Sequence, residues 1–143
     1  MKKALIITVA ALVAAAWCGC TKSGEYADLK AYLNKVITIN EEYVSALEKA
    51  NSAQDVADAM TGLGNKMEGM AKEGAAIRKK YSDMNRLRKD PPPEIKEELH
   101  KLEQLARRLL EVSMKTMQYM TDPAVKEASR EMTRKMVGAN IVK

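Results

Sequence analysis

The 143-residue chain has no phenylalanine, one tryptophan, one histidine and two cysteines. One histidine, His100, without a nearby cysteine or convergent carboxylates does not assemble a catalytic triad, a zinc site or a haem site. The sequence also contains no glycine-rich phosphate loop, no HExxH motif and no CxxCH motif. We therefore expect a protein that is not an enzyme and that carries no cofactor.

The N-terminal residues follow the order of a secretory signal. Met1-Lys2-Lys3 precedes thirteen residues, Ala4–Ala16, of which only Thr8 is polar, and small residues and cysteine follow. A charged start, a short apolar run and small residues are typical of a signal peptide. Thirteen helical residues rise about 20 Å, short of the roughly 30 Å hydrocarbon core of a bilayer. A cleaved signal is therefore expected rather than a permanent membrane span.

The sequence AWCGC at residues 16–20 resembles the lipobox of bacterial lipoproteins, in which a small residue precedes the lipidated cysteine. This resemblance implies that residues 1–19 are removed and that Cys20 carries the lipid that anchors the protein to a membrane. Thr21 stands where an aspartate would follow the modified cysteine, which in Gram-negative lipoproteins implies sorting to the outer membrane. We expect the protein to be held there by its lipid, on the periplasmic face. The alternative interpretation of the two cysteines is a disulfide or thiol pair.

Processing at this site would change the chemistry of the mature chain. The first cysteine would leave with the signal and Cys20 would be blocked, so no free thiol would remain. Loss of the two signal lysines would leave 22 basic against 19 acidic side chains, a net charge of +3 rather than +5, and we expect no nucleic-acid partner. Residues 20–24 would form the lipidated cysteine and its tether. Four residues reach at most about 14 Å, so the folded domain is expected close to the lipid surface.

Apolar residues recur every three or four positions through the rest of the chain, which is the period of amphipathic helices. Helices are predicted over about 25–50, 53–88, 93–120 and 123–137, and residues 139–143 form a tail. The sequence is expected to fold as an all-α, up-and-down four-helix bundle over residues 25–138, with a short fourth helix.

Helix boundaries are marked by capping residues and prolines. Ser52 followed by Asp55 predicts a capped N-terminus, and Asp122 before Pro123 predicts another. The triproline at residues 91–93 must interrupt a helix, because proline lacks a backbone donor and restricts the residue before it.

A second resemblance concerns the bundle. The segments ALEKANSAQDVADAM (46–60), PEIKEELHKLEQL (93–105) and AVKEA (124–128) are similar, in order and spacing, to the soluble periplasmic b-type cytochromes, which are four-helix bundles. In that family a methionine and a histidine bind haem. By this resemblance Ile37 occupies the methionine position and Lys143 the histidine position, and His100 matches a histidine that is not a ligand. The resemblance implies the bundle without the haem.

Methionine is over-represented, with ten in the chain. Methionine side chains fill irregular gaps in a core, and core filling is the expected role. The alternative is a soft-metal site, because thioethers bind Cu(I) and spacings of three place them on one helix face. The residues for that site would be Met67, Met70, Met114, Met117 and Met120.

Glycine and basic residues gather in the predicted second helix. Gly62, Gly64, Gly69 and Gly74 each cost about 1 kcal/mol relative to alanine in a helix, which indicates either close helix packing or a deformable pocket for an apolar ligand or a partner helix. The basic residues are either a solvated helix end or a contact with an anionic surface such as lipid headgroups or cell-wall polymer. They are Arg78, Lys79, Lys80, Arg86, Arg88 and Lys89.

These observations favour a lipid-anchored, non-enzymatic helical binding or structural module. Its partners would be the membrane, through Cys20, and a protein or a second copy of the chain packed on the helix seams. The alternative function is a carrier of a ligand or soft metal in a methionine-rich core.

Overall fold

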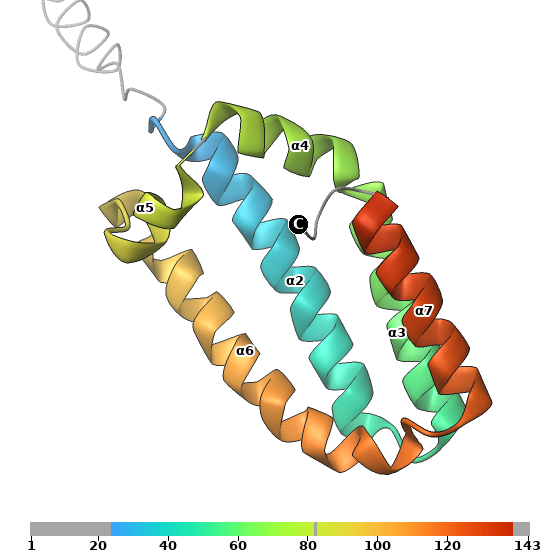
Figure 1. Ribbon diagram of the computed structural model, residues 1–143. Helices are drawn as coiled ribbons and strands as arrows, with labels where there is room; N and C mark the ends of the chain where they lie inside the picture. Colours follow the sequence, from blue (N-terminus) through green and yellow to red (C-terminus); the bar gives the residue numbers. More distant parts are fainter. Residues whose placement is uncertain (1–23, 82, 139–143) are drawn as a thin grey trace, which may run out of the picture.

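The computed structural model describes residues 24–81 and 83–138, and this part of the chain is all-α (Figure 1). Long helices that follow one another run in alternate directions, so the predicted all-α, up-and-down bundle is confirmed. The elements are α2 (Ala27–Lys49), α3 (Ala53–Gly69), α4 (Ala71–Lys80), α5 (Met84–Lys89), η1 (Pro93–Ile95), α6 (Lys96–Thr116), η2 (Met117–Tyr119) and α7 (Pro123–Gly138). Among the described residues, no helix has both the length and the apolar character needed to cross a bilayer.

The predicted caps form as expected. The Ser52 side chain accepts a hydrogen bond from the Asp55 backbone N–H at 3.1 Å, and Asp55 Oδ2 accepts one from the Ser52 N–H at 3.0 Å. This reciprocal pair satisfies N–H groups at the start of α3 that have no partner within the helix. At α7, Asp122 Oδ1 accepts from the Ala124 N–H at 2.8 Å, and Pro123 is the first helical residue.

The helices bury two apolar clusters. The larger one joins all four long helices, with Val44 of α2, Val56 of α3, Val112 of α6 and Val125 of α7 among its buried members. The smaller cluster lies at the end of the bundle where α2 begins, and its buried residues are Leu29, Leu33, Ile77 and Ile95. All described members of both clusters lie between Tyr26 and Met132.

The predicted continuous helix over residues 53–88 is wrong, because the structure divides this range into α3, α4 and α5. A straight helix over that range would be about 54 Å long, whereas α2, with 23 residues, measures about 35 Å. The bend after Gly69 turns α4 across the end of the bundle (Figure 1). Ile77 is thereby buried beside Leu29 and Leu33, instead of projecting beyond the partner helix. A second break follows α4, where Asp83 accepts a hydrogen bond from the Arg86 N–H and caps α5.

The packing order of the long helices is α6, α2, α3 and α7. Helix α7 packs along α3, and α6 packs along α2. Figure 1 shows the resulting arrangement, with α2 in the middle, α6 on one side, and α3 with α7 on the other. The N-terminal end of α2 and helices α4 and α5 share one end of the bundle.

Candidate functional site

The corner between α4 and α5 is tied to the start of α2. The Tyr81 hydroxyl lies 2.8 Å from the Glu25 carbonyl oxygen and 2.5 Å from Asp28 Oδ1, and it can donate its hydrogen to either. Lys80 Nζ donates to Asp28 Oδ2 at 2.7 Å. The rings of Tyr26 and Tyr81 stack with their centres 5.7 Å apart. These contacts hold the corner against the residues at which the described chain begins.

The charged groups of Lys80 and Asp28 at this corner stabilise one another. The Lys80 ammonium, and after it the Tyr81 hydroxyl, lower the pKa of Asp28 from 3.8 to about 2. The same hydrogen bond from Lys80 to Asp28 raises the pKa of the Lys80 ammonium. Asp28 therefore stays ionised and paired with Lys80 at all but strongly acidic pH.

The six predicted basic residues lie on this corner, in the last turn of α4 and in α5. Lys80 pairs with Asp28. In the ranges 24–81 and 83–138, the other five side chains form no ion pair within 4.0 Å, although Lys30, Lys35, Lys66 and others elsewhere do. A cavity of about 690 Å³ beside the corner contains both signs of charge. It is lined by Glu25, Tyr26, Lys80, Tyr81, Asp83, Arg86, Leu87, Asp90, Pro91, Pro92 and Pro93.

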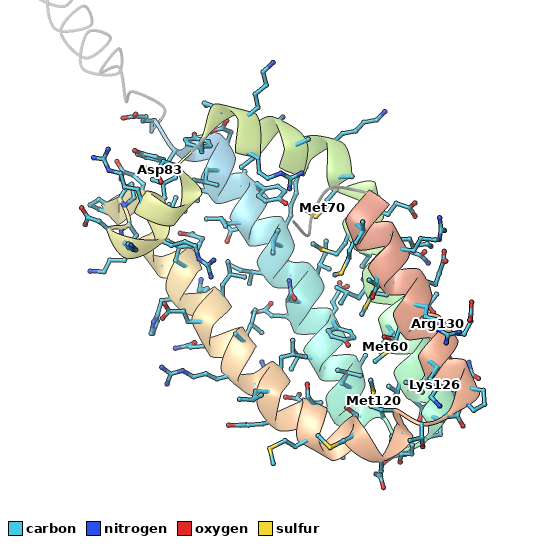
Figure 2. The ribbon with its side chains drawn as sticks, viewed as in Figure 1. Met60, Met70, Asp83, Met120, Lys126 and Arg130 are labelled. Carbon is cyan, nitrogen blue, oxygen red and sulfur yellow. The ribbon has the colours of Figure 1, made fainter. Side chains whose placement is uncertain are left out.

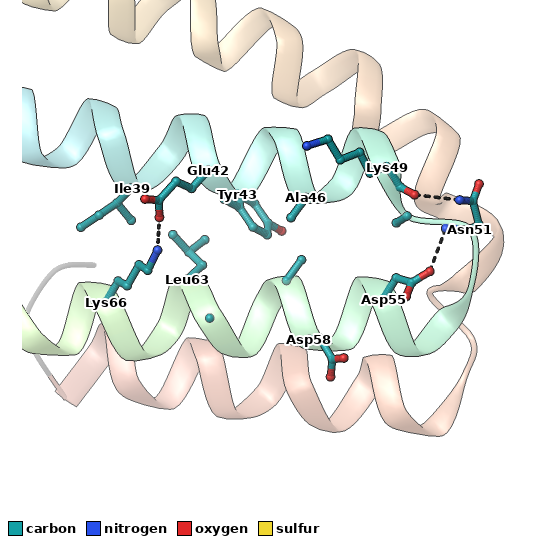
Figure 3. Close-up of a pocket in the computed structure, with 13 residues that line it drawn as sticks. Ile39, Glu42, Tyr43, Ala46, Lys49, Asn51, Asp55, Asp58, Leu63 and Lys66 are labelled. Atoms are coloured by element: carbon teal, nitrogen blue, oxygen red, sulfur yellow. Dashed lines mark hydrogen bonds and ion pairs between the residues drawn. The ribbon is translucent and has the colours of Figure 1, made fainter.

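A groove of about 600 Å³ runs between α2 and α3 (Figure 3). Its walls include the apolar side chains of Ile39, Tyr43 and Leu63. Burial raises the pKa of the Tyr43 hydroxyl. An ion pair between Glu42 and Lys66 crosses the groove (Figure 3). The apolar walls and polar rim suit an elongated apolar group.

The four glycines divide into two kinds. A Cβ on Gly64 would lie 3.2 Å from Met132 Cα of α7, and one on Gly74 would lie 2.8 Å from the Tyr32 hydroxyl oxygen. At Gly62, which lines the groove, and at Gly69, a Cβ would meet nothing within 4 Å. Gly64 therefore permits close packing of α3 and α7, as the packing interpretation predicts, whereas Gly62 leaves open space.

The structure does not bring the five predicted metal-binding methionines together. Met67 and Met70 are buried in the last turn of α3 and just beyond it, while Met114 lies in the last turn of α6 and Met117 and Met120 follow that helix. Because α3 and α6 run in opposite directions, these two groups lie at opposite ends of the bundle, as the labelled Met70 and Met120 show (Figure 2). The prediction that these five methionines form one metal site is therefore wrong.

Core filling is also only part of the role of methionine. Met60, Met67 and Met70 are buried, but Met114 is 72% and Met117 66% exposed. Met117 was expected on the buried face of its helix. Thr116, four residues after Val112, is buried instead, and Met117, one residue further along, lies about 100° farther around the helix, on the exposed side.

An exposed apolar strip on α6 was missed in the sequence. Leu110, 69% exposed, lies four residues before Met114 and seven before Met117, so the three share one helix face. The neighbouring cavity of about 230 Å³ is lined by Met60 together with Met117 and Met120. The sequence did contain the pattern for this strip, because Leu110, Met114 and Met117 recur at helical spacing beside the row of buried residues.

Glu98 is the other feature that the sequence did not indicate. Its side chain is 4% exposed, and Oε1 lies 3.4 Å from Lys30 Nζ. Oε2 has no hydrogen-bond partner among the described residues. Glu97, next to it, is exposed and pairs with Lys101, so the two carboxylates face different sides of α6, as the helical period predicts.

The remaining predicted positions fall as follows. Cys20, the signal at 1–19 and the tail at 139–143, which includes Lys143, lie outside the described residues. Ile37 is buried in the larger cluster, and His100 is exposed beside Gln104. Within the described ranges no three histidine, cysteine or acidic side chains form a cluster that could hold a metal ion.

In comparisons with known proteins, no family model, curated protein or solved structure matches the chain.

Proposed function

We propose that this protein is a lipoprotein, anchored through Cys20 to the periplasmic face of the outer membrane, whose helical domain is a non-enzymatic binding or structural module. The sequence from Met1 to Cys20 carries this proposal, with its paired lysines, short apolar run and lipobox. The described residues begin at Gly24, whose Cα would lie at most about 14 Å from that of the lipidated Cys20, four positions earlier.

The exposed apolar strip supports a binding role. Leu110 and Met114 lie on the C-terminal half of α6, and Met117 follows in η2, at the end of the bundle away from the start of α2. Contiguous exposed apolar side chains are typical of interaction sites, and flexible methionine side chains adapt to different partners. A domain anchored at one end would present this strip away from the membrane, to a protein partner or to a second copy.

Membrane fractionation of two cysteine variants tests the anchor. C20A should leave the membrane fraction or accumulate with its signal uncleaved, because the acceptor of the lipid is gone. The matched control C18A changes the neighbouring cysteine and should remain in the outer membrane like the unaltered protein. Outer-membrane association that survives C20A, or that is lost equally in C18A, would contradict the proposal.

A soft-metal carrier is the second candidate, favoured by the three thioethers that line one small cavity, those of Met60, Met117 and Met120. Titration with Cu(I) or Ag(I) tests it. Binding should disappear in M60L/M117L/M120L and persist in the control M67L/M70L. The absence of binding by the unaltered protein would eliminate this candidate.

A further inference from the structure

The positive charge of this protein is concentrated in one short stretch. Residues 78–89 contain six of the 24 basic side chains and one of the 19 acidic ones, so the rest of the chain balances at 18 of each. The whole net charge of +5 therefore belongs to these twelve residues. Without the two signal lysines the remainder would be slightly negative, and the stretch alone would make the mature protein basic.

The fold places this stretch beside the residues at which the described chain begins. The contacts of Tyr81 and Lys80 with Glu25 and Asp28 fix the end of α4 against the first turn of α2. Arg86 of α5 lines the same cavity as Glu25. The stretch thus lies at the end of the bundle at which the described chain begins, whereas Lys126 lies toward the other end and Arg130 lies midway along α7 (Figure 2).

We propose that the α4–α5 corner binds the anionic phospholipid headgroups of the leaflet that holds the lipid anchor and so sets the orientation of the bundle. The inference rests on the proposed function, because the lipid on Cys20 would bring the corner to that surface. Arg78, Lys79, Arg86, Arg88 and Lys89 have no ion-pair partner among the described residues, so their charges are available to the leaflet. Lys80 serves instead to hold the corner in place.

The residues around the charges suit a lipid interface. Tyr26 and Tyr81 stack at the corner, and tyrosine is enriched at membrane–water interfaces because its ring is apolar and its hydroxyl polar. The nearby cavity holds the carboxylates of Glu25, Asp83 and Asp90 against two cations, so it is not a pocket for a single phosphate. The contact is a charged surface rather than a headgroup site, and lipids of equal charge should bind equally.

Vesicle binding by the chain from residue 21 onward tests this inference without the lipid anchor. The described members of the two apolar clusters all lie between Tyr26 and Met132, so this chain retains them. It should bind phosphatidylcholine vesicles containing phosphatidylglycerol, and bind those containing phosphatidylserine equally at equal charge. It should bind pure phosphatidylcholine far more weakly. Binding should fall between 0.1 and 1 M salt, as the screening length shortens from about 10 to about 3 Å.

Two matched double variants locate the contact. R88Q/K89Q should weaken binding to anionic vesicles about 25-fold, since each basic residue at an anionic surface contributes roughly five-fold. The control K126Q/R130Q removes the same charge from the exposed face of α7 and should change binding less than about two-fold. Equal losses in both variants would show that net charge alone acts and would overturn the proposal.

Other results would overturn it as well. Equal binding to neutral and anionic vesicles would remove the electrostatic basis, and binding to anionic cell-wall polymer but not to anionic vesicles would assign the corner to another partner. If anionic vesicles are not bound but C20A loses its outer-membrane association as expected, the anchor stands and only the proposed orientation is refuted. The reverse pattern would refute the anchor and with it the orientation toward that leaflet, although the corner would still bind anionic headgroups.

Discussion

Replacing Gly64 by alanine should destabilise the bundle, although the same change at Gly62 should stabilise it. Alanine in place of a helical glycine stabilises a protein by about 1 kcal/mol where the added methyl group has space. Gly62 has that space, since a Cβ there meets nothing within 4 Å. At Gly64 the Cβ would lie 3.2 Å from Met132 Cα, a backbone atom of α7 that cannot move independently of its helix. Overpacking of this kind costs about 1–3 kcal/mol, so G64A should lose about 0–2 kcal/mol net.

Urea unfolding followed by circular dichroism measures both variants, and an unchanged m value shows that the same transition is compared. The separation between them should be about 1–3 kcal/mol, or several degrees in Tm for a domain of this size. Hydrogen exchange adds a local readout, because α7 packs along α3 and its amides should exchange faster in G64A. If G64A stabilises the protein as much as G62A does, then α3 and α7 do not approach closely at Gly64, and this description of their packing is wrong.

Three further predictions concern a helix cap, an exposed ion pair and a buried carboxylate. S52A should lose about 1 kcal/mol in urea unfolding, because the N-terminus of α3 loses its capping hydroxyl; no loss would contradict the capping role. The folded pKa of Asp28, about 2, lies below its ordinary value of 3.8, so its pairing stabilises the fold fully above 3.8 and is lost as the pH falls through 2. A midpoint near 3.8 in an NMR titration of the Asp28 carboxyl would refute this pairing. In D28N, the loss of hydrogen-exchange protection that acid causes at the α4–α5 corner should disappear. In a double-mutant cycle of K30M and E98Q, K30M alone should cost more than K30M/E98Q, because it leaves the carboxylate of Glu98 buried and unpaired; additive effects would contradict their coupling.

The fold could be predicted where local chemistry determined it. The apolar spacing marked the helices, and Ser52 with Asp55 marked the start of α3. The bend after Gly69 could not be derived from the spacing, because the apolar seam continues through it to Tyr81. The reason for the bend is tertiary, since α2 is too short to cover a straight helix and Ile77 is buried by turning back.

The candidate sites depended still more on the arrangement of the helices. The sequence located the six basic residues, and only the tie between Tyr81 and Asp28 shows that they lie at the start of α2. The five methionines were compatible with one site by spacing within each helix, but the opposite directions of α3 and α6 separate them. Spacing along a helix predicts a shared face and does not predict which end of a neighbouring helix lies opposite.

The lipid anchor is tested most directly by the intact mass of the protein extracted from bacterial membranes. We expect a polypeptide that begins at Cys20 and carries added acyl groups on that residue. A chain that still begins at Met1, or one whose Cys20 is unmodified, would contradict the lipid anchor and with it the orientation proposed for the bundle.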